Sequence, residues 1–127
     1  MTVTDTDAAG WATTAREAIR AVNHATRPTT GFPGLKYPGD VYKILGRLRE
    51  MTASLEQTCD QLAAFLDRAE RTGAIALAGT RPTTDADVTA AVADATDALH
   101  AARVSAARLS TRLGDAQSAV ASMYTPA

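Results

Sequence analysis

Apolar residues recur at alternating spacings of four and three along residues 85–123. This heptad pattern, sustained over about five heptads, is typical of a helix that packs against another helix. Thr84 and Asp87 have the spacing of a capping box, which satisfies the free amides at a helix start. We therefore predict a helix from Asp85 to about Met123. Its predicted packing positions are Val88, Val92, Ala95, Leu99, Ala102, Ala106, Leu109, Leu113, Ala116, Val120 and Met123.

A second amphipathic segment follows the sequence YPGD at residues 37–40. Asp40 is a suitable N-cap because its carboxylate can accept hydrogen bonds from free amides of the first turn. Gly73 is a suitable residue to end the helix. We predict a helix of roughly 33 residues, about 50 Å long. Its predicted packing positions are Val41, Leu45, Leu48, Leu55, Leu62, Leu66 and Ala69, with Ile44, Met51 and Phe65 widening the stripe.

A shorter helix is predicted from about Gly10 to Thr26, because apolar residues share one helical face there. Pro28 and Gly31 end it. Residues 1–9 are predicted to be a disordered N-terminal tail, residues 10–123 a single helical-bundle domain, and residues 124–127 a short C-terminal tail. The apolar face of the first helix consists of Trp11, Ala15, Ala18, Ile19, Val22 and Ala25.

These segments predict an all-α fold. A chain of 127 residues fits one domain. The two long helices should form an antiparallel hairpin, with the short first helix packed on it, as an elongated three-helix bundle. Alanine at many packing positions should let the helix backbones approach closely.

The loop GFPGLKYPGDVY at residues 31–42 is rich in glycine, proline and aromatic residues. It has two interpretations. Its aromatic side chains either fold back to plug the open end of the bundle, or form an interface of the kind that aromatic residues dominate. We favour plugging by Phe32, Leu35, Tyr37 and Tyr42, and expect Lys36 and Tyr37 to face outward most.

Charge is unevenly distributed although the net charge is only −1, which argues against a general nucleic-acid or membrane coat. Residues 85–97 carry four acids and no base, whereas residues 43–49 carry three bases and no acid. Folding should bring residues 43–49 beside Arg108 and Arg112, creating a basic pole that carries the loop. Like-charged neighbours four residues apart destabilise a helix slightly, so they favour an anionic ligand or an antiparallel homodimer. These pairs are Arg16/Arg20, Lys43/Arg47 and Arg108/Arg112.

Several chemistries have no support in the sequence. His24, His100 and the single cysteine, Cys59, have no metal-ligand spacing. Gly31 and Gly34 do not fit the phosphate-binding P-loop pattern. We therefore expect no cofactor, no metal and no enzyme activity. No apolar run approaches the roughly 20 residues that span a bilayer, and no secretory signal is recognisable. The eleven arginines against two lysines are typical of a GC-rich bacterial genome, so we expect a bacterial, cytoplasmic protein.

The hypothesis is a non-enzymatic interaction or adaptor protein that forms a homodimer and docks a protein partner at the basic pole. The alternative is a nucleic-acid-binding accessory protein that places Arg16, Arg20, Arg47, Arg49, Arg108 and Arg112 on phosphates. A third option is a subunit that needs another chain to complete an enzyme site. The candidate partner-binding residues are Phe32, Lys36, Tyr37, Tyr42, Lys43, Arg47, Arg49, Arg108 and Arg112.

Overall fold

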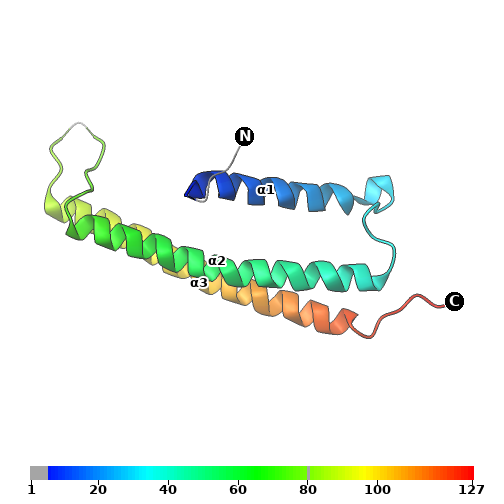
Figure 1. Ribbon diagram of the computed structural model, residues 1–127. Helices are drawn as coiled ribbons and strands as arrows, with labels where there is room; N and C mark the ends of the chain where they lie inside the picture. Colours follow the sequence, from blue (N-terminus) through cyan, green and yellow to red (C-terminus); the bar gives the residue numbers. More distant parts are fainter. Residues whose placement is uncertain (1–5, 80) are drawn as a thin grey trace.

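The computed structural model describes residues 6–79 and 81–127 and confirms the all-α fold (Figure 1). Its helices are α1 (Ala8–Ala25), α2 (Pro38–Arg71) and α3 (Asp85–Val120), and a 3₁₀ turn (Pro28–Thr30) lies between α1 and α2. Residues 1–5 of the expected N-terminal tail lie outside the described residues.

The start of α1 differs from the sequence prediction. The helix begins at Ala8, not Gly10, so the last residues of the expected tail are helical. The cause is Asp7, whose carboxylate accepts a hydrogen bond of 2.9 Å from the Gly10 amide and so caps the helix. Because Asp7 is the N-cap, the helix starts two residues earlier in the chain than predicted.

The long helices α2 and α3 form the predicted antiparallel hairpin (Figure 1). Interactions between them define the register. Arg103 Nε lies 3.0 Å from Asp60 Oδ2, and Ser110 Oγ donates to the Arg49 carbonyl at 3.4 Å. Gln117 Nε2 donates to the Tyr42 carbonyl at 3.4 Å. The basic stretch of α2 therefore lies beside the basic stretch of α3, as expected.

The surface of α2 that meets α3 is only partly the predicted one. Of the predicted packing residues, Ala69 is buried, but Leu55 and Leu62 are exposed. The others are half-buried: Val41, Leu45, Leu48 and Leu66. Thr52 and Ala63, which were not predicted to pack, are buried. Apolar residues of α2 form two stripes, and periodicity alone does not say which one meets α3. The stripe with small side chains does, because alanine and threonine permit close backbone approach. The Thr52 hydroxyl donates to its own helix at the Arg49 carbonyl, 2.9 Å away, so its burial leaves no unpaired donor.

The second half of α3 shows the same correction. Leu109 and Ala116 were predicted to pack but are exposed, and their neighbours Ser110 and Gln117 turn toward α2 instead. The resulting core is thin. Its buried apolar residues are Ala63, Ala69, Val88, Val92 and Ala106.

Helix α1 runs alongside the first half of α2 (Figure 1). Within the described residues, no Cα atom of α1 comes within 8 Å of a Cα atom in α2 or α3. Ile19, Val22 and Ala25 are half-buried, but Ala15 and Ala18 of the same predicted face are exposed. The loop that joins α1 to α2 therefore contributes to holding α1 in place.

The start of α2 uses Asp40 differently from the prediction. The helix begins at Pro38, a favoured first residue, and Asp40 lies in the first turn instead of preceding it. Its Oδ2 accepts from the amides of Lys36 at 2.7 Å and Tyr37 at 2.9 Å. The hydrogen bonds from Tyr37 and Lys36 lower the pKa of Asp40. The capping box of Thr84 and Asp87 at the start of α3 is confirmed, and its hydrogen bonds with Thr84 lower the pKa of Asp87.

Replacing Asp40 by asparagine is expected to lower the thermal midpoint at pH 7. A carboxyl whose pKa is lowered by folding stabilises the protein above its unfolded value of about 3.9, and this stabilisation is lost as the pH falls through the folded value. The difference between wild type and Asp40→Asn should therefore shrink below about pH 4. Circular dichroism melts from pH 3 to 7 measure it. Asp97→Asn, which removes an exposed acid in the middle of α3, is the control; an equal effect of both variants at pH 7 would contradict the capping role.

Candidate interaction surface at the loop end

Backbone hydrogen bonds attach the loop to the end of α1. The Gly34 amide donates to the Ala25 carbonyl at 2.6 Å, and the Phe32 amide donates to the Arg27 carbonyl at 3.0 Å. Gly31 has φ of 78°, which glycine adopts readily, but Phe32 follows with φ of 52°. A bulky residue in this left-handed region carries backbone strain of order 1–3 kcal/mol. The loop therefore holds Phe32 in a defined but strained conformation.

The predicted plugging of the bundle end is wrong for most of the aromatic residues. Phe32, Tyr37 and Tyr42 are 47%, 52% and 42% exposed, and only Leu35 is half-buried. Lys36 is exposed, as expected for it and for Tyr37. Hydrogen bonds to α1 and to Asp40 hold the loop from its backbone, so its aromatic rings are not needed as a plug.

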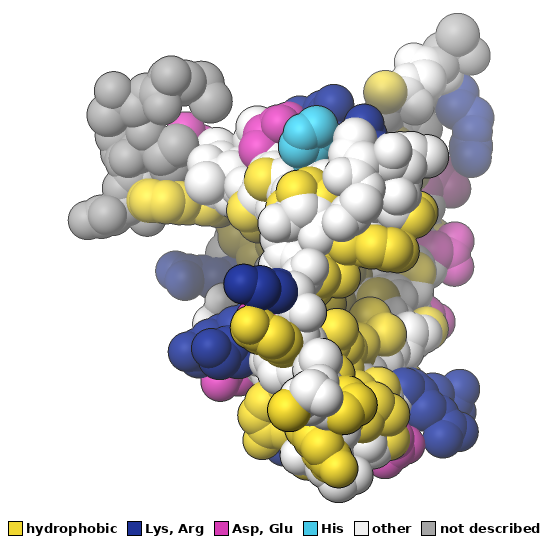
Figure 2. Space-filling model, turned by 90° about the vertical axis from the view of Figure 1, so that its right-hand side faces the viewer, with side chains coloured by type: hydrophobic (Ala, Val, Ile, Leu, Met, Phe, Trp, Pro, Cys, Tyr) yellow, Lys and Arg dark blue, Asp and Glu magenta, His cyan; other side chains and the backbone are white. Residues whose placement is uncertain are grey.

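A shallow groove of about 430 Å³ lies between the loop and the ends of the two long helices. We call it the loop groove. Figure 2 shows this end of the molecule, where hydrophobic side chains gather with charged side chains of both signs on either side of them. Lys36 is the charged residue of the groove lining, so an apolar ligand with an acidic group suits the groove. Its apolar lining is Phe32, Leu35, Tyr37, Pro38, Val41, Val120 and Met123.

Lys36, the cation that lines the loop groove, forms no ion pair with any acid that the structure describes. Among the described residues, Arg27, Lys36 and Lys43 form no ion pair. The Lys36 ammonium lies over the Tyr37 ring, 5.4 Å from its centroid. The nearby carboxylate, Asp40, is occupied by two backbone amides. Of the described residues, those that line the groove therefore include one cation, Lys36, and no acid.

The structure divides the remaining predicted site residues between other surfaces. Tyr42 and Arg49 line a polar cleft with Ser110 and Gln117, which shares no residue with the loop groove. Arg108 and Arg112 line a third depression together with Glu56. Arg47 is paired with Glu50 at 3.2 Å and belongs to none of the three. The predicted basic pole is thus a region with separate surfaces. Phe32, Lys36 and Tyr37 are the candidate residues that meet in the loop groove.

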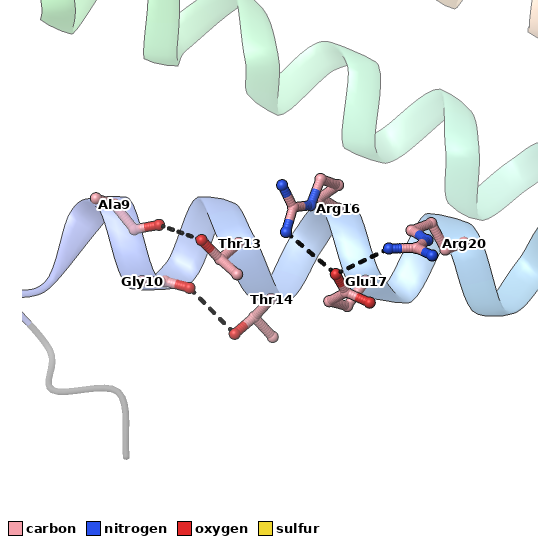
Figure 3. A network of polar contacts seen from close by, with 7 residues as sticks. All are labelled: Ala9, Gly10, Thr13, Thr14, Arg16, Glu17 and Arg20. Carbon is pink, nitrogen blue, oxygen red and sulfur yellow. Dashed lines mark hydrogen bonds and ion pairs between the residues drawn. The ribbon is translucent and has the colours of Figure 1, made fainter. Parts of the chain in front are cut away.

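Acids beside the like-charged pairs weaken the argument that these pairs need a ligand. Glu17 Oε1 lies between Arg16 and Arg20, at 3.2 and 3.5 Å from their guanidinium groups (Figure 3). Arg112 lies 3.5 Å from Asp115. Such exposed pairs contribute little stability. They do reduce the repulsion inside each pair, so the unpaired Lys36 in the loop groove is the stronger indication of an anionic partner.

Five groove residues were missed as functional candidates: Leu35, Pro38, Val41, Val120 and Met123. Leu35 was interpreted as a plug, and Val41, Val120 and Met123 as packing residues. The missed signal was position. Val120 and Met123 lie at the end of the heptad pattern. A packing position there is next to the first turn of the partner helix, and beyond that turn no further helix of the described chain covers it. A terminal position of this kind can line a groove while fitting the pattern.

Comparisons with known proteins give no identification: no protein family, no curated protein and no solved structure matches this chain. Within residues 6–79 and 81–127, no helix has the length and apolar character needed to cross a membrane. The same described part of the chain holds no cluster of three or more potential metal-ligating side chains. The candidate function rests on the loop groove.

Proposed function

We propose that the protein is a non-enzymatic interaction module that docks an acidic, amphipathic segment of a partner protein in the loop groove. A cytoplasmic location, a homodimeric state and the lack of catalysis belong to this proposal and rest on the sequence. The observation that carries the proposal is the combination of an apolar groove with Lys36, a cation without an ion pair among the described residues, in its lining. Apolar anchors supply most of the affinity of such interfaces, and complementary charges supply specificity and speed of association.

The strained Phe32 supports docking over a purely structural role. Its ring is about half exposed, although the backbone adopts a conformation that costs energy for a bulky residue. An asparagine or glycine would suit the same φ without that cost. A partner-binding ring at this position explains why the chain has phenylalanine there.

A phage-displayed library of random 12-residue peptides tests the proposal with the purified protein as bait. The selected peptides should combine Asp or Glu with Leu, Phe or Met. A synthetic copy of a selected peptide, labelled with fluorescein, should bind Phe32→Asn about tenfold or more weakly, because an anchor ring is lost. Lys36→Glu with Lys43→Glu should also weaken binding, and more so at low salt. Urea unfolding of Phe32→Asn should stay within about 1 kcal/mol of wild type, because asparagine tolerates φ above zero.

The matched control is Val104→Ser, which removes an apolar side chain that is 48% exposed and lies outside the loop groove. It should bind the peptide as wild type does. Selection of no acidic peptide, or equal binding by Phe32→Asn, would refute docking in the groove. Salt-sensitive binding of single-stranded dT20 without any peptide binding would instead favour the nucleic-acid alternative.

A further inference from the structure

An exposed apolar stripe runs along α2 on a side that neither the loop groove nor the α3 interface uses. It consists of Leu48, Met51, Leu55, Leu62 and Phe65, and we call it the outer stripe. Its spacing of three, four, seven and three residues keeps these side chains on one helical face. Leu48 and Met51 are half-buried. Leu55, Leu62 and Phe65 are 44%, 51% and 67% exposed.

The exposed residues of the outer stripe lie in the second half of α2. Figure 1 shows α1 alongside the first half of α2, with no helix in that position over the second half. Among the described residues, the second half of α2 therefore has no helix alongside it other than α3. In stable folds a helix buries its apolar stripe against another element. In this protein the largest apolar side chains of the second half of α2 are exposed, while the hairpin core consists mainly of small residues. The uncovered half indicates a missing partner helix.

Small residues of α3 border the outer stripe. Ala98 and Ala102 are exposed, and the helical repeat puts them on the edge of the hairpin that holds Leu55 and Leu62. The opposite edge is marked by the Arg103–Asp60 ion pair. The large side chains on α2 form a ridge, and the alanines on α3 beside it form a shallow groove. Another helix can pack closely on such a surface.

The charges of the hairpin identify the occupant. Residues 85–97 at one end carry four acids and no base, and residues 43–49 at the other carry three bases and no acid. In an antiparallel pair the basic end of each hairpin points toward the acidic end of the other. A parallel copy would bring like charges together.

We propose that the outer stripe is the self-association surface, and that a second copy of this chain packs on it in antiparallel orientation. The two-fold axis passes near residue 60, midway between Leu55 and Phe65, so the uncovered halves of the two stripes cover each other. This makes an isologous interface, in which the same patch is used by both copies. The inference is independent of docking in the loop groove.

Light scattering during size-exclusion chromatography tests the self-association. Wild type at about 100 µM, a concentration suited to interfaces of modest size, should have twice the monomer mass of 13.3 kDa. The mass should fall toward the monomer value at about 0.5 M salt, which screens the end-to-end charge pairing. Leu62→Ser with Phe65→Ser should give a monomer with unchanged helical circular dichroism, because both side chains are already exposed. Val104→Ser should remain dimeric.

Cysteine cross-linking tests the orientation. In a Cys59→Ala background, Gln61→Cys should form a disulfide between copies, because residues 61 of two antiparallel helices lie about 3 Å apart along the axis. Ser54→Cys, one heptad earlier on the same side of α2, should not, because its separation is about 18 Å and a disulfide needs Cα atoms within about 7 Å. A parallel pair would cross-link at both positions.

Each outcome decides the proposal. A monomer at every concentration, or a dimer that survives Leu62→Ser with Phe65→Ser, would overturn the outer stripe as the interface. Cross-linking at both positions, or a dimer that 0.5 M salt leaves unchanged, would overturn the antiparallel arrangement. Loss of peptide binding in the loop groove would leave the dimer intact, so the two proposals fail separately.

Discussion

Replacing Ala63 by leucine is expected to lower the free energy of unfolding by about 1–3 kcal/mol, the usual cost of forcing extra methylenes into a packed core. Ala63 is only 4% exposed and lies where α2 meets α3. A leucine there would push the backbones of the two long helices apart. The core has few other buried apolar side chains that could readjust. Urea unfolding followed by circular dichroism measures the change.

The neighbouring residue supplies a matched control. Ala64 is exposed on the same helix, and alanine and leucine are both strong helix formers. Ala64→Leu should therefore change the free energy of unfolding by less than about 0.5 kcal/mol. If the two substitutions had equal effects, α2 and α3 would not pack closely through Ala63, and the observed interface would be incorrect.

Replacing Gly34 by alanine is expected to destabilise the protein by about 1–3 kcal/mol through loss of its hydrogen bond to the Ala25 carbonyl and displacement of the loop. A Cβ atom at this position would lie 2.9 Å from the Ala25 carbonyl oxygen and 3.0 Å from the Ala25 Cβ. The backbone oxygen cannot turn away as a flexible side chain can. The same displacement should weaken peptide binding in the loop groove, because Phe32 and Leu35 flank Gly34.

A second glycine of the loop should respond in the opposite direction. Gly39 lies in the first turn of α2, and an added Cβ there would have no neighbour within 4 Å. Gly39→Ala should raise the free energy of unfolding by up to about 1 kcal/mol, since alanine favours the helix. Urea unfolding of both variants gives the comparison. If Gly34→Ala raised the free energy of unfolding as Gly39→Ala does, Gly34 would not be in contact with the end of α1.

The two proposed surfaces divide the molecule. The loop groove lies at the basic end and has the unpaired cation Lys36 in its lining, whereas the outer stripe lies along α2 and is apolar. A dimer formed through the outer stripes would place the two loop grooves at opposite ends of the assembly. A protein of this design would present the same docking site twice, which raises the avidity for a partner with repeated acidic segments.

The sequence by itself determined the helices, the antiparallel hairpin and its register. Each depends on local signals. Heptad spacing specifies a helix with an apolar face, and the capping box of Thr84 and Asp87 specifies where α3 starts. Two long helices of similar length that are joined by one short connection pair in antiparallel orientation, with the residues next to the connection side by side. The separation of acidic and basic ends follows from the same register.

Only the tertiary structure decided which face of α2 meets α3 and where the loop side chains lie. Leu55 and Leu62 look like core residues in the sequence, and Thr52 does not, yet Thr52 is buried and the leucines are exposed. The reason is steric and polar together. Close packing selects the smaller side chains, and a threonine hydroxyl that bonds to its own helix can be buried at little cost. The loop groove likewise forms only when Val120 and Met123, about 80 residues from Val41 in the chain, meet the loop. Sequence periodicity specifies each helical face but not the partner that each face will have.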